Sequence, residues 1–226
     1  MEICFILVEP ATPENVGAAA RALKTMGFAS LRLVNPCDYL SPPARWLAHA
    51  SSDILENATV FHSLEEALHD IDFKIGTTAK KRSVKNDYFP LPDLPDFLTR
   101  KKSSLQKTAV VFGREESGLT NEELKLCDLV TTVPLQTSYP SLNLAQAVML
   151  YCYELSKLNY ITTEKANKNE QGFSALKEKI KTVLHDTGFK ENTNIYPRFF
   201  ERLNFLGEDD IHLLHSFCNK YLQNKK

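Results

Sequence analysis

The sequence lacks any hydrophobic run long enough to cross a membrane. Its longest clean apolar stretch is Ile3–Val8, six residues that can fill a buried strand, whereas a membrane-spanning helix needs about 20. The N-terminus opens directly into this stretch, without the basic region, longer apolar core and small-residue cleavage site of a signal peptide. We therefore expect a cytoplasmic protein without a membrane partner.

Cysteine pairs and a surplus of one charge are also missing. The five cysteines (Cys4, Cys37, Cys127, Cys152 and Cys218) are scattered, and none belongs to a C-x-x-C pair. This spacing disfavours zinc ligation and a disulfide framework, so we expect small buried thiols and no bound metal. The 27 Lys and Arg residues are balanced by 28 Asp and Glu residues. A nucleic-acid partner would therefore have to bind to local basic patches.

Glycine-rich nucleotide loops are absent where an α/β protein would carry them. The strand-like run Ile3–Val8 is not followed by G-x-G-x-x-G, and the two-glycine segment Gly113–Gly118 is not followed by Gly-Lys-Ser/Thr. An ordinary α/β enzyme that uses a nicotinamide or a phosphate ligand is therefore disfavoured.

Strand-like and helix-like segments alternate over the first 157 residues. Capping residues predict helix starts at Thr12-Pro13, Ser63 and Thr120, and Gly27 is expected to end the first helix. The predicted strands are residues 3–8, 31–34, 73–78, 108–112 and 129–133. One face of a final helix carries Leu144, Val148, Tyr151, Leu155 and Leu158. This order predicts an α/β fold with a mostly parallel sheet and helices on both faces.

The ligand site of such a sheet lies beyond the carboxyl ends of its strands. We therefore expect the functional residues in the loops after Val8, Thr78, Phe112 and Val133. The predicted sheet domain spans residues 1–158, a polar lysine-rich linker spans 159–171, and a helical extension spans 172–226. The apolar positions expected to face the core of that extension are Phe173, Leu176, Ile180 and Val183, and then Ile211, Leu214, Phe217 and Tyr221.

Three segments combine unusual residues with these loops. The first is Asn15–Ala22, a run of small residues in which Asn15 and Arg21 are the only long polar groups. A plain alanine-rich packing helix with a solvated arginine explains it equally well. In the second, Gly113–Thr120, Gly113 would let the backbone approach a ligand and Gly118 permits a positive φ. In the third, Tyr139–Ala145, Ser141 or Asn143 could simply cap the last helix.

Together the three segments resemble the SPOUT family of knotted RNA methyltransferases, and more closely its TrmJ/LasT branch, within the TrmH family, of tRNA/rRNA ribose methyltransferases. The motifs N-x-G-A-A-A-R-A, F-G-R-E-x-x-G-L-T and S-L-N-L-A-x-A-V all occur in the right order within residues 1–157. The resemblance implies a deep trefoil knot in the C-terminal part of the sheet domain, a homodimer with its active site near the subunit boundary, and S-adenosylmethionine as cofactor. The residues it assigns to the cofactor are Thr77, Thr78, Ala79, Gly113, Val133, Pro140, Ser141, Leu142 and Asn143.

The same resemblance implies methyl transfer to a ribose 2′-hydroxyl, with Arg21, Asn15 and Ser141 as catalytic residues. Because arginine is almost never deprotonated, we expect Arg21 to stabilise negative charge on the 2′-oxygen rather than to act as a base. The closest precedent modifies the pyrimidine at the 5′ edge of the tRNA anticodon loop, position 32. Ribosomal RNA, a base nitrogen as acceptor, and an inactive RNA-binding protein of the same fold are the alternatives.

RNA binding requires positive charge near the strand ends. Lys80, Lys81 and Arg82 follow a predicted strand, and Arg114 lies in the second segment. A solvated loop is the simpler interpretation of the run Arg100–Lys102. Lysines at 80 and 81 replace the Ala-Arg-Ser-Arg pattern usual in tRNA-modifying members of the branch, which leaves the RNA target open.

Overall fold

The computed structural model describes residues 1–79, 88–136, 142–160, 172–189 and 195–224. They fall into two compact units. The first comprises Glu2–Pro95 and Lys107–Thr162, and the second comprises Met1, Asp96–Gln106 and Thr163–Lys226. The sequence did not predict that segment 96–106 groups with the tail, and the predicted domain limits at residues 158 and 172 remain predictions.

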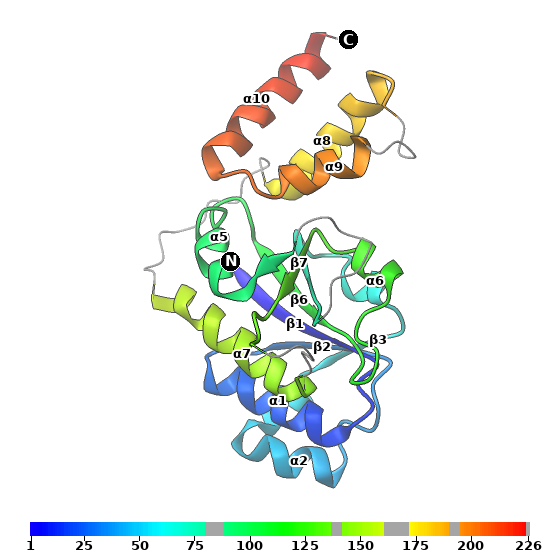
Figure 1. The fold of residues 1–226 in the computed structure, drawn as a ribbon, viewed down its shortest axis with the longest axis vertical. Helices are drawn as coiled ribbons and strands as arrows, with labels where there is room; N and C mark the ends of the chain where they lie inside the picture. Colours follow the sequence, from blue (N-terminus) through cyan, green and yellow to red (C-terminus); the bar gives the residue numbers. More distant parts are fainter. Residues whose placement is uncertain (80–87, 137–141, 161–171, 190–194, 225–226) are drawn as a thin grey trace. The chain divides into compact units, whose positions relative to one another are not determined.

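The first unit is built on a seven-stranded sheet in the order β3-β2-β1-β6-β4-β7-β5 (Figure 1). Every pairing between these strands is parallel, so the predicted α/β fold with a parallel sheet is confirmed. The strands are β1 Glu2–Val8, β2 Ser30–Val34, β3 Thr59–Phe61, β4 Phe73–Thr77, β5 Phe89–Pro90, β6 Lys107–Phe112 and β7 Leu129–Thr132. The helices are α1 Pro13–Thr25, α2 Pro42–Ala48, α3 Ser52–Glu56, α4 Leu64–Ala67, α6 Asn121–Lys125 and α7 Leu144–Ser156, with short 3-10 turns at His49–Ser51, Leu91–Asp93 and Lys157–Tyr160. Helix α5, Leu94–Thr99, begins in this unit, and its residues from Asp96 on belong to the second.

Helices cover the sheet on both faces because both faces of its central strands are apolar. Alternate residues of β1 (Cys4, Ile6 and Val8) join a core that includes side chains of α4 and α6. On the other face Phe5 packs against Phe112, whose ring meets Tyr151 of α7 at 5.2 Å between centroids. Figure 1 shows α1 and α7 side by side on that face.

Helix α1 packs so closely against α2 that only glycine fits at the contact. A Cβ on Gly17 would lie 2.0 Å from the carbonyl oxygen of Ala44. The helix begins with Pro13 at its first turn and is followed by Gly27 at φ 82°, as predicted. Thr12 is the N-cap residue but forms no side-chain capping hydrogen bond. The small residues of the first segment therefore serve packing within the chain.

The two predicted capping boxes differ in outcome. The box at Thr120 and Glu123 is complete. At the start of α4, Ser63 Oγ accepts a hydrogen bond from the Glu66 N–H, but the Glu66 carboxylate accepts from the N–H of His62 instead of Ser63. This half-formed box precedes a helix of only four residues.

The second unit is helical, with α8 Phe173–Asp186, α9 Ile195–Leu203 and α10 Glu208–Asn224. On α8 the buried positions are Phe173, Leu176, Ile180 and Leu184, so Val183 was a wrong choice by one residue. On α10 the prediction was wrong for Phe217, which is 59% exposed, because the buried face carries Ile211, His215 and Cys218. Burial of His215 breaks the apolar spacing, since its ring contacts Lys179 Nζ and the carbonyl oxygen of Gly172.

Among the described residues, none of the helices has both the length and the apolar character needed to cross a membrane. The predicted trefoil knot remains a prediction. The connections that follow β4 and β7 include residues 80–87 and 137–141, which lie outside the described residues.

Candidate functional site

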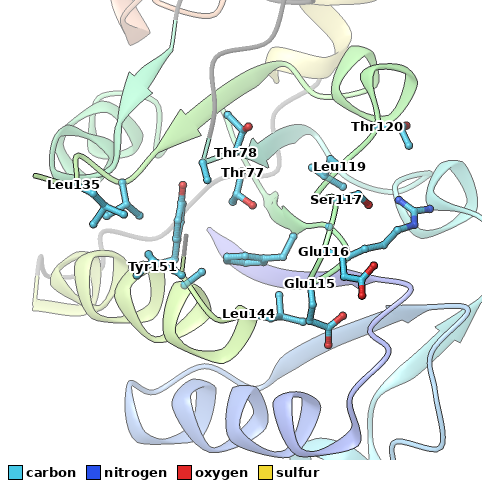
Figure 2. A pocket seen from close by; sticks show the side chains of 18 of the residues that line it. Thr77, Thr78, Glu115, Glu116, Ser117, Leu119, Thr120, Leu135, Leu144 and Tyr151 are labelled. Atoms are coloured by element: carbon cyan, nitrogen blue, oxygen red, sulfur yellow. The ribbon is translucent and has the colours of Figure 1, made fainter. Parts of the chain in front are cut away.

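A cavity of about 600 Å³ opens beyond the carboxyl ends of β4, β6 and β7 (Figure 2). Three stretches that are distant in sequence form its wall: residues 77–79, 112–121 and 133–151 in part. This is the edge at which parallel sheets bind ligands. The loops predicted after Thr78, Phe112 and Val133 therefore line one cavity, whereas the loop after Val8 is not part of its described lining.

Six of the residues predicted to hold a cofactor line this cavity. They are Thr77, Thr78, Ala79, Gly113, Val133 and Leu142. Asn143 directly precedes α7 and caps it, as its simpler interpretation predicted, by accepting hydrogen bonds from Ala145 N and Gln146 N. Pro140 and Ser141 lie outside the described residues, as do Lys80, Lys81 and Arg82.

A polar network joins the three sequence segments at the rim of this cavity. Asn143 Nδ2 donates to Asn15 Oδ1 at 2.8 Å, and Asn15 Nδ2 donates to Glu115 Oε1 at 3.1 Å. Glu115 also accepts hydrogen bonds from the backbone N–H groups of Ala11 and Thr12, at 3.0 and 3.1 Å. Burial raises the pKa of Glu115, but these hydrogen bonds outweigh it and the pKa is lowered overall. The network therefore contains a carboxylate at neutral pH.

The turn 113–118 is closed by its own backbone. Arg114 and Gly118 exchange two hydrogen bonds, and a Cβ on Gly113 would lie 2.1 Å from the carbonyl carbon of Gly118. Gly113 is thus required by the turn itself, and its predicted part in the approach of a ligand remains a prediction. Gly118 has φ 69°, as predicted.

Arg114 anchors this turn to its surroundings. Its guanidinium donates to Glu9 at 2.8 Å and to both oxygens of Glu123 at 3.1 Å. Hydrogen bonds to Glu9 and then Glu123 raise the pKa of Arg114. Two carboxylates already neutralise the side chain, so its predicted contact with RNA remains a prediction beside a clear structural role.

The apolar floor of the cavity includes Tyr151, which the sequence placed only in the core. The Tyr151 hydroxyl hydrogen-bonds Thr131 Oγ1 at 2.7 Å. The Thr131 hydroxyl donates in turn to the carbonyl oxygen of Gly76. Burial raises the pKa of Tyr151, so the phenol stays neutral. Periodicity alone could not separate a pocket residue from a core residue on the same helix face.

Arg21 lies outside the cavity lining of its own chain. Its side chain is exposed on α1, and within the described part of the chain it takes part in no ion pair. A free guanidinium on the surface can accept an anionic partner.

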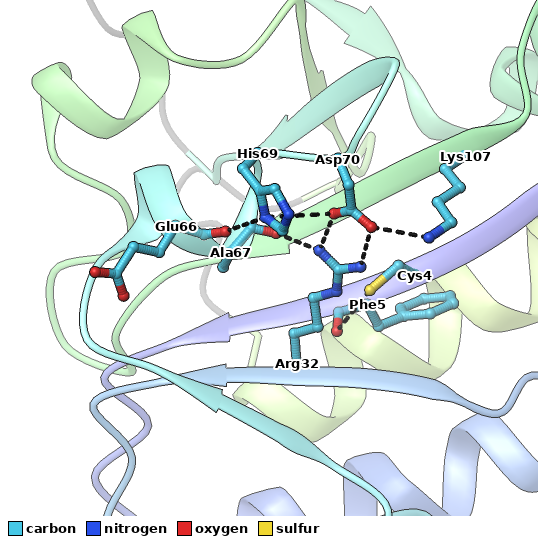
Figure 3. A network of polar contacts seen from close by, with 8 residues as sticks. All are labelled: Cys4, Phe5, Arg32, Glu66, Ala67, His69, Asp70 and Lys107. Carbon is cyan, nitrogen blue, oxygen red and sulfur yellow. Dashed lines mark hydrogen bonds and ion pairs between the residues drawn. The ribbon is translucent and has the colours of Figure 1, made fainter.

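A second cluster of charges lies where β4 and β6 begin (Figure 3). Asp70 forms a two-pronged ion pair with Arg32, at 2.6 and 2.9 Å, and accepts from Lys107 Nζ at 2.8 Å. The hydrogen bond from Arg32 is the main cause that lowers the pKa of Asp70, and Lys107 adds to it. This cluster ties the amino ends of the strands together.

We expect Asp70→Asn to destabilise the protein by about 1–2 kcal/mol, since it removes charged hydrogen bonds at a partly exposed site. Because the folded-state pKa is lowered, the stabilisation is complete above the ordinary aspartate pKa of about 3.9 and is lost as pH falls below it. Urea unfolding of both proteins from neutral to acid pH measures the difference. The exposed Asp93→Asn serves as control, and equal losses in the two variants would contradict the assignment.

The parallel sheet, with its cavity beyond the carboxyl edge, defines a ligand-binding protein of the doubly wound α/β class. Residues 2–153 match the SpoU rRNA methylase family, and residues 170–225 match the C-terminal domain of the tRNA/rRNA methyltransferase LasT. The chain belongs to the SpoU rRNA methylase family and is a tRNA/rRNA methyltransferase.

Two similar proteins agree with this assignment. The uncharacterized tRNA/rRNA methyltransferase LasT of Escherichia coli K12 is 44% identical over 225 residues, covering 99% of this chain and 99% of LasT. The tRNA (cytidine/uridine-2′-O-)-methyltransferase TrmJ of Photorhabdus laumondii is 36% identical over 198 residues, covering 83% of this chain and 80% of TrmJ. The resemblance to the TrmJ/LasT branch is thus confirmed.

Solved structures share the fold. A methylase family protein from Haemophilus influenzae Rd KW20 is 31% identical with a TM-score of 0.66, covering 99% of this chain and 98% of that one. The SpoU methyltransferase AviRb from Streptomyces viridochromogenes, in complex with the cofactor AdoMet, is 21% identical with a TM-score of 0.58. It covers 71% of this chain and 62% of AviRb, and at this identity the likeness concerns the fold alone.

Proposed function

We propose that this protein uses S-adenosylmethionine to methylate ribose 2′-hydroxyls of RNA, with tRNA as the favoured substrate. The observation that carries the proposal is the single cavity formed by residues 77–79, 113–121 and 133–142, with Asn15 and Asn143 joined at its rim. The name of the TrmJ relative, a tRNA 2′-O-methyltransferase for cytidine and uridine, supports the ribose acceptor.

The cavity suits this cofactor in size, charge and polarity. Its volume of about 600 Å³ falls within the usual range for small-molecule sites. Glu116 lines it, and a carboxylate favours a positively charged ligand. The buried Oδ1 of Asn121, also in the wall, has no hydrogen-bond partner among the described residues. A ligand that carries hydroxyl and amino donors fits such a wall.

When bound, S-adenosylmethionine supplies a methyl group on a positively charged sulfur. The loops at Thr77–Ala79, Gly113 and Val133 hold it, together with Pro140–Asn143, largely through backbone atoms. Asn15 and Ser141 orient the ribose hydroxyl, and much of the rate enhancement comes from this positioning. Arg21 binds the neighbouring phosphate and stabilises the negative charge that develops on the 2′-oxygen.

Because Arg21 is exposed and lies outside the cavity lining of its own chain, we place it in the active site of a second copy. A homodimer through the surfaces of α1 and α7 would bring one protomer's Arg21 to the partner's cavity. RNA would lie along Lys80, Lys81 and Arg82, with Arg114 at its border, and its binding would weaken steeply with salt.

The test combines cofactor binding with product identification. Calorimetry of the purified chain with S-adenosylmethionine is expected to give 1:1 binding per protomer. Incubation with unmodified tRNA and methyl-labelled cofactor, followed by nucleoside mass spectrometry, is expected to give a 2′-O-methylated pyrimidine nucleoside.

Each other result contradicts part of the proposal. A label found in a base would exclude the ribose acceptor, and methylation of rRNA but not tRNA would replace the substrate. RNA binding without cofactor binding would identify an inactive RNA-binding protein. Column chromatography with light scattering reports the dimer, and a monomer would remove the shared site.

A further inference from the structure

We propose that Glu115 is a positioning residue whose carboxylate holds the start of α1 and sets the orientation of the Asn15 amide against Asn143. This inference rests on the proposed function, because it assumes that Asn15 acts on the ribose hydroxyl. Neither the predicted site residues nor the motif analysis assigned Glu115 a role.

The hydrogen bonds around Glu115 fix which group donates and which accepts at each contact. Asn143 Oδ1 caps α7, so its Nδ2 group must be the donor toward Asn15. Asn15 must therefore present its oxygen to Asn143 and its NH2 group to Glu115. Only an acceptor at position 115 completes this chain, and a carboxylate offers acceptors on both of its oxygens.

The second task of Glu115 is to hold the backbone that leads into α1. Thr12 makes no side-chain capping hydrogen bond, and the N–H groups of Ala11 and Thr12 donate to the two oxygens of Glu115 instead. A negative group at the start of a helix also interacts favourably with its dipole. A residue 103 positions away in the sequence thus holds the backbone that leads into α1, where the N-cap residue makes no side-chain hydrogen bond.

The location of this network connects it to the reaction. Strands β1 and β6 are neighbours at the point where the strand order reverses, with β2 on one side of β1 and β4 on the other side of β6. Glu115 follows β6, and Ala11 and Thr12 follow β1. Helix α1 carries Arg21 two turns after Asn15, so a loosened start of α1 would displace both side chains.

Glu115 lines the cavity, so its variants must separate positioning from direct cofactor binding and from base catalysis. The chosen variants are Glu115→Gln, Asn15→Ala and their combination, in the full chain. Glu14→Gln is the matched control, because Glu14 is exposed in the first turn of the same helix and, within the described residues, forms no hydrogen bond or ion pair.

We expect Glu115→Gln to lower kcat by between about 10- and 100-fold, the range for misplaced active-site groups. The Kd for S-adenosylmethionine, measured by calorimetry, should change by less than about threefold, because the Glu115 carboxylate is engaged by Ala11, Thr12 and Asn15 and most contact residues contribute little to binding energy. Because Glu115 acts in part through Asn15, the loss of kcat in the double variant should be smaller than the product of the two single losses. Glu14→Gln should match the wild type.

The pH profile supplies a readout that a base would move. Since the pKa of Glu115 is lowered, the carboxylate stays charged from about pH 6 to 9, and the ratio of wild-type to variant kcat should be constant there. Should Glu115→Gln fail to fold by circular dichroism, the shorter Glu115→Asp takes its place in the same cycle.

Three results would overturn the inference: losses that add in the double variant, a Kd that weakens in proportion to kcat, or a ratio that changes with pH. An inactive wild type would instead defeat the proposed function. The two failures are therefore distinguishable.

Discussion

Replacing Arg21 by alanine is expected to lower kcat by about 10³-fold, the upper range for loss of one transition-state charge stabiliser, while cofactor binding stays almost unchanged. The side chain is exposed and does not line the cavity of its own chain, so its removal leaves the cofactor wall intact. Calorimetry with S-adenosylmethionine and single-turnover methylation of tRNA measure the two quantities separately.

Two further variants make this result specific to Arg21. Arg21→Lys keeps the charge but loses the planar fork that grips phosphate, so only part of the activity should return. Lys24→Ala removes a neighbouring exposed cation that pairs with Asp53, and its kcat should stay within about twofold of the wild type. Loss of cofactor binding in Arg21→Ala, with turnover otherwise normal at saturation, would refute the role.

The proposed sharing of the site between two protomers can be tested with a mixed dimer. If each protomer lends Arg21 to its partner, heterodimers of Arg21→Ala with a cofactor-site variant contain one complete site. Mixing the two inactive variants should then restore activity, and each heterodimer should be about half as active as a wild-type dimer. Absence of any restoration would place Arg21 in its own chain's site or in none.

Replacing Gly113 by alanine is expected to weaken cofactor binding by about 100-fold and to destabilise the protein by about 2–4 kcal/mol. The added Cβ would lie 2.1–2.4 Å from Gly118 and Leu119 backbone atoms. Because backbone cannot rotate away as a side chain can, the turn must open. Opening it breaks the hydrogen bonds between Arg114 and Gly118 and moves the cavity wall.

The neighbouring glycine provides the contrast. Gly118 has φ 69° but open space where its Cβ would lie, and asparagine tolerates this backbone conformation. Gly118→Asn should therefore lower the free energy of unfolding by no more than about 2 kcal/mol. Guanidinium unfolding and calorimetry compare the two variants, and equal effects would mean that the close approach of backbone at Gly113 is not limiting.

The central strands could be predicted to within one residue at each end, because burial on both faces leaves a continuous apolar run. Ile3–Val8 became Glu2–Val8, and residues 129–133 became Leu129–Thr132. The edge strands β3 and β5 were missed. They have three and two residues, and Val60 of β3 is 45% exposed, so neither carries an apolar signal.

Helices α2, α3 and α5 were missed for a related reason. Each has seven residues or fewer, which is too short for a clear amphipathic period. Their existence depends on neighbours: Ala44 and Ala48 of α2 are fully buried, and only tertiary packing against α1 identifies them as core.

The sequence predicted the loops of the candidate site but not the hydrogen bonds that join them. The order of strand ends placed Thr78, Gly113 and Val133 at one edge of the sheet, and they line one cavity. Glu115 was missed because its partners lie about 100 positions away in the sequence. The spacing of neighbouring residues in the sequence cannot predict a contact over this separation.

One of the cysteines can be used to examine the hydrogen-bond network around Glu115. Cys37 is half-buried, whereas Cys4, Cys127, Cys152 and Cys218 are buried. Partial burial and then the negative charge of Glu115 raise the pKa of the Cys37 thiol. Because the thiolate is the form that reacts, we expect the alkylation rate of Cys37 to change when the charge at the start of α1 changes. The native Cys37 can therefore be used to follow this charge, and no cysteine needs to be introduced.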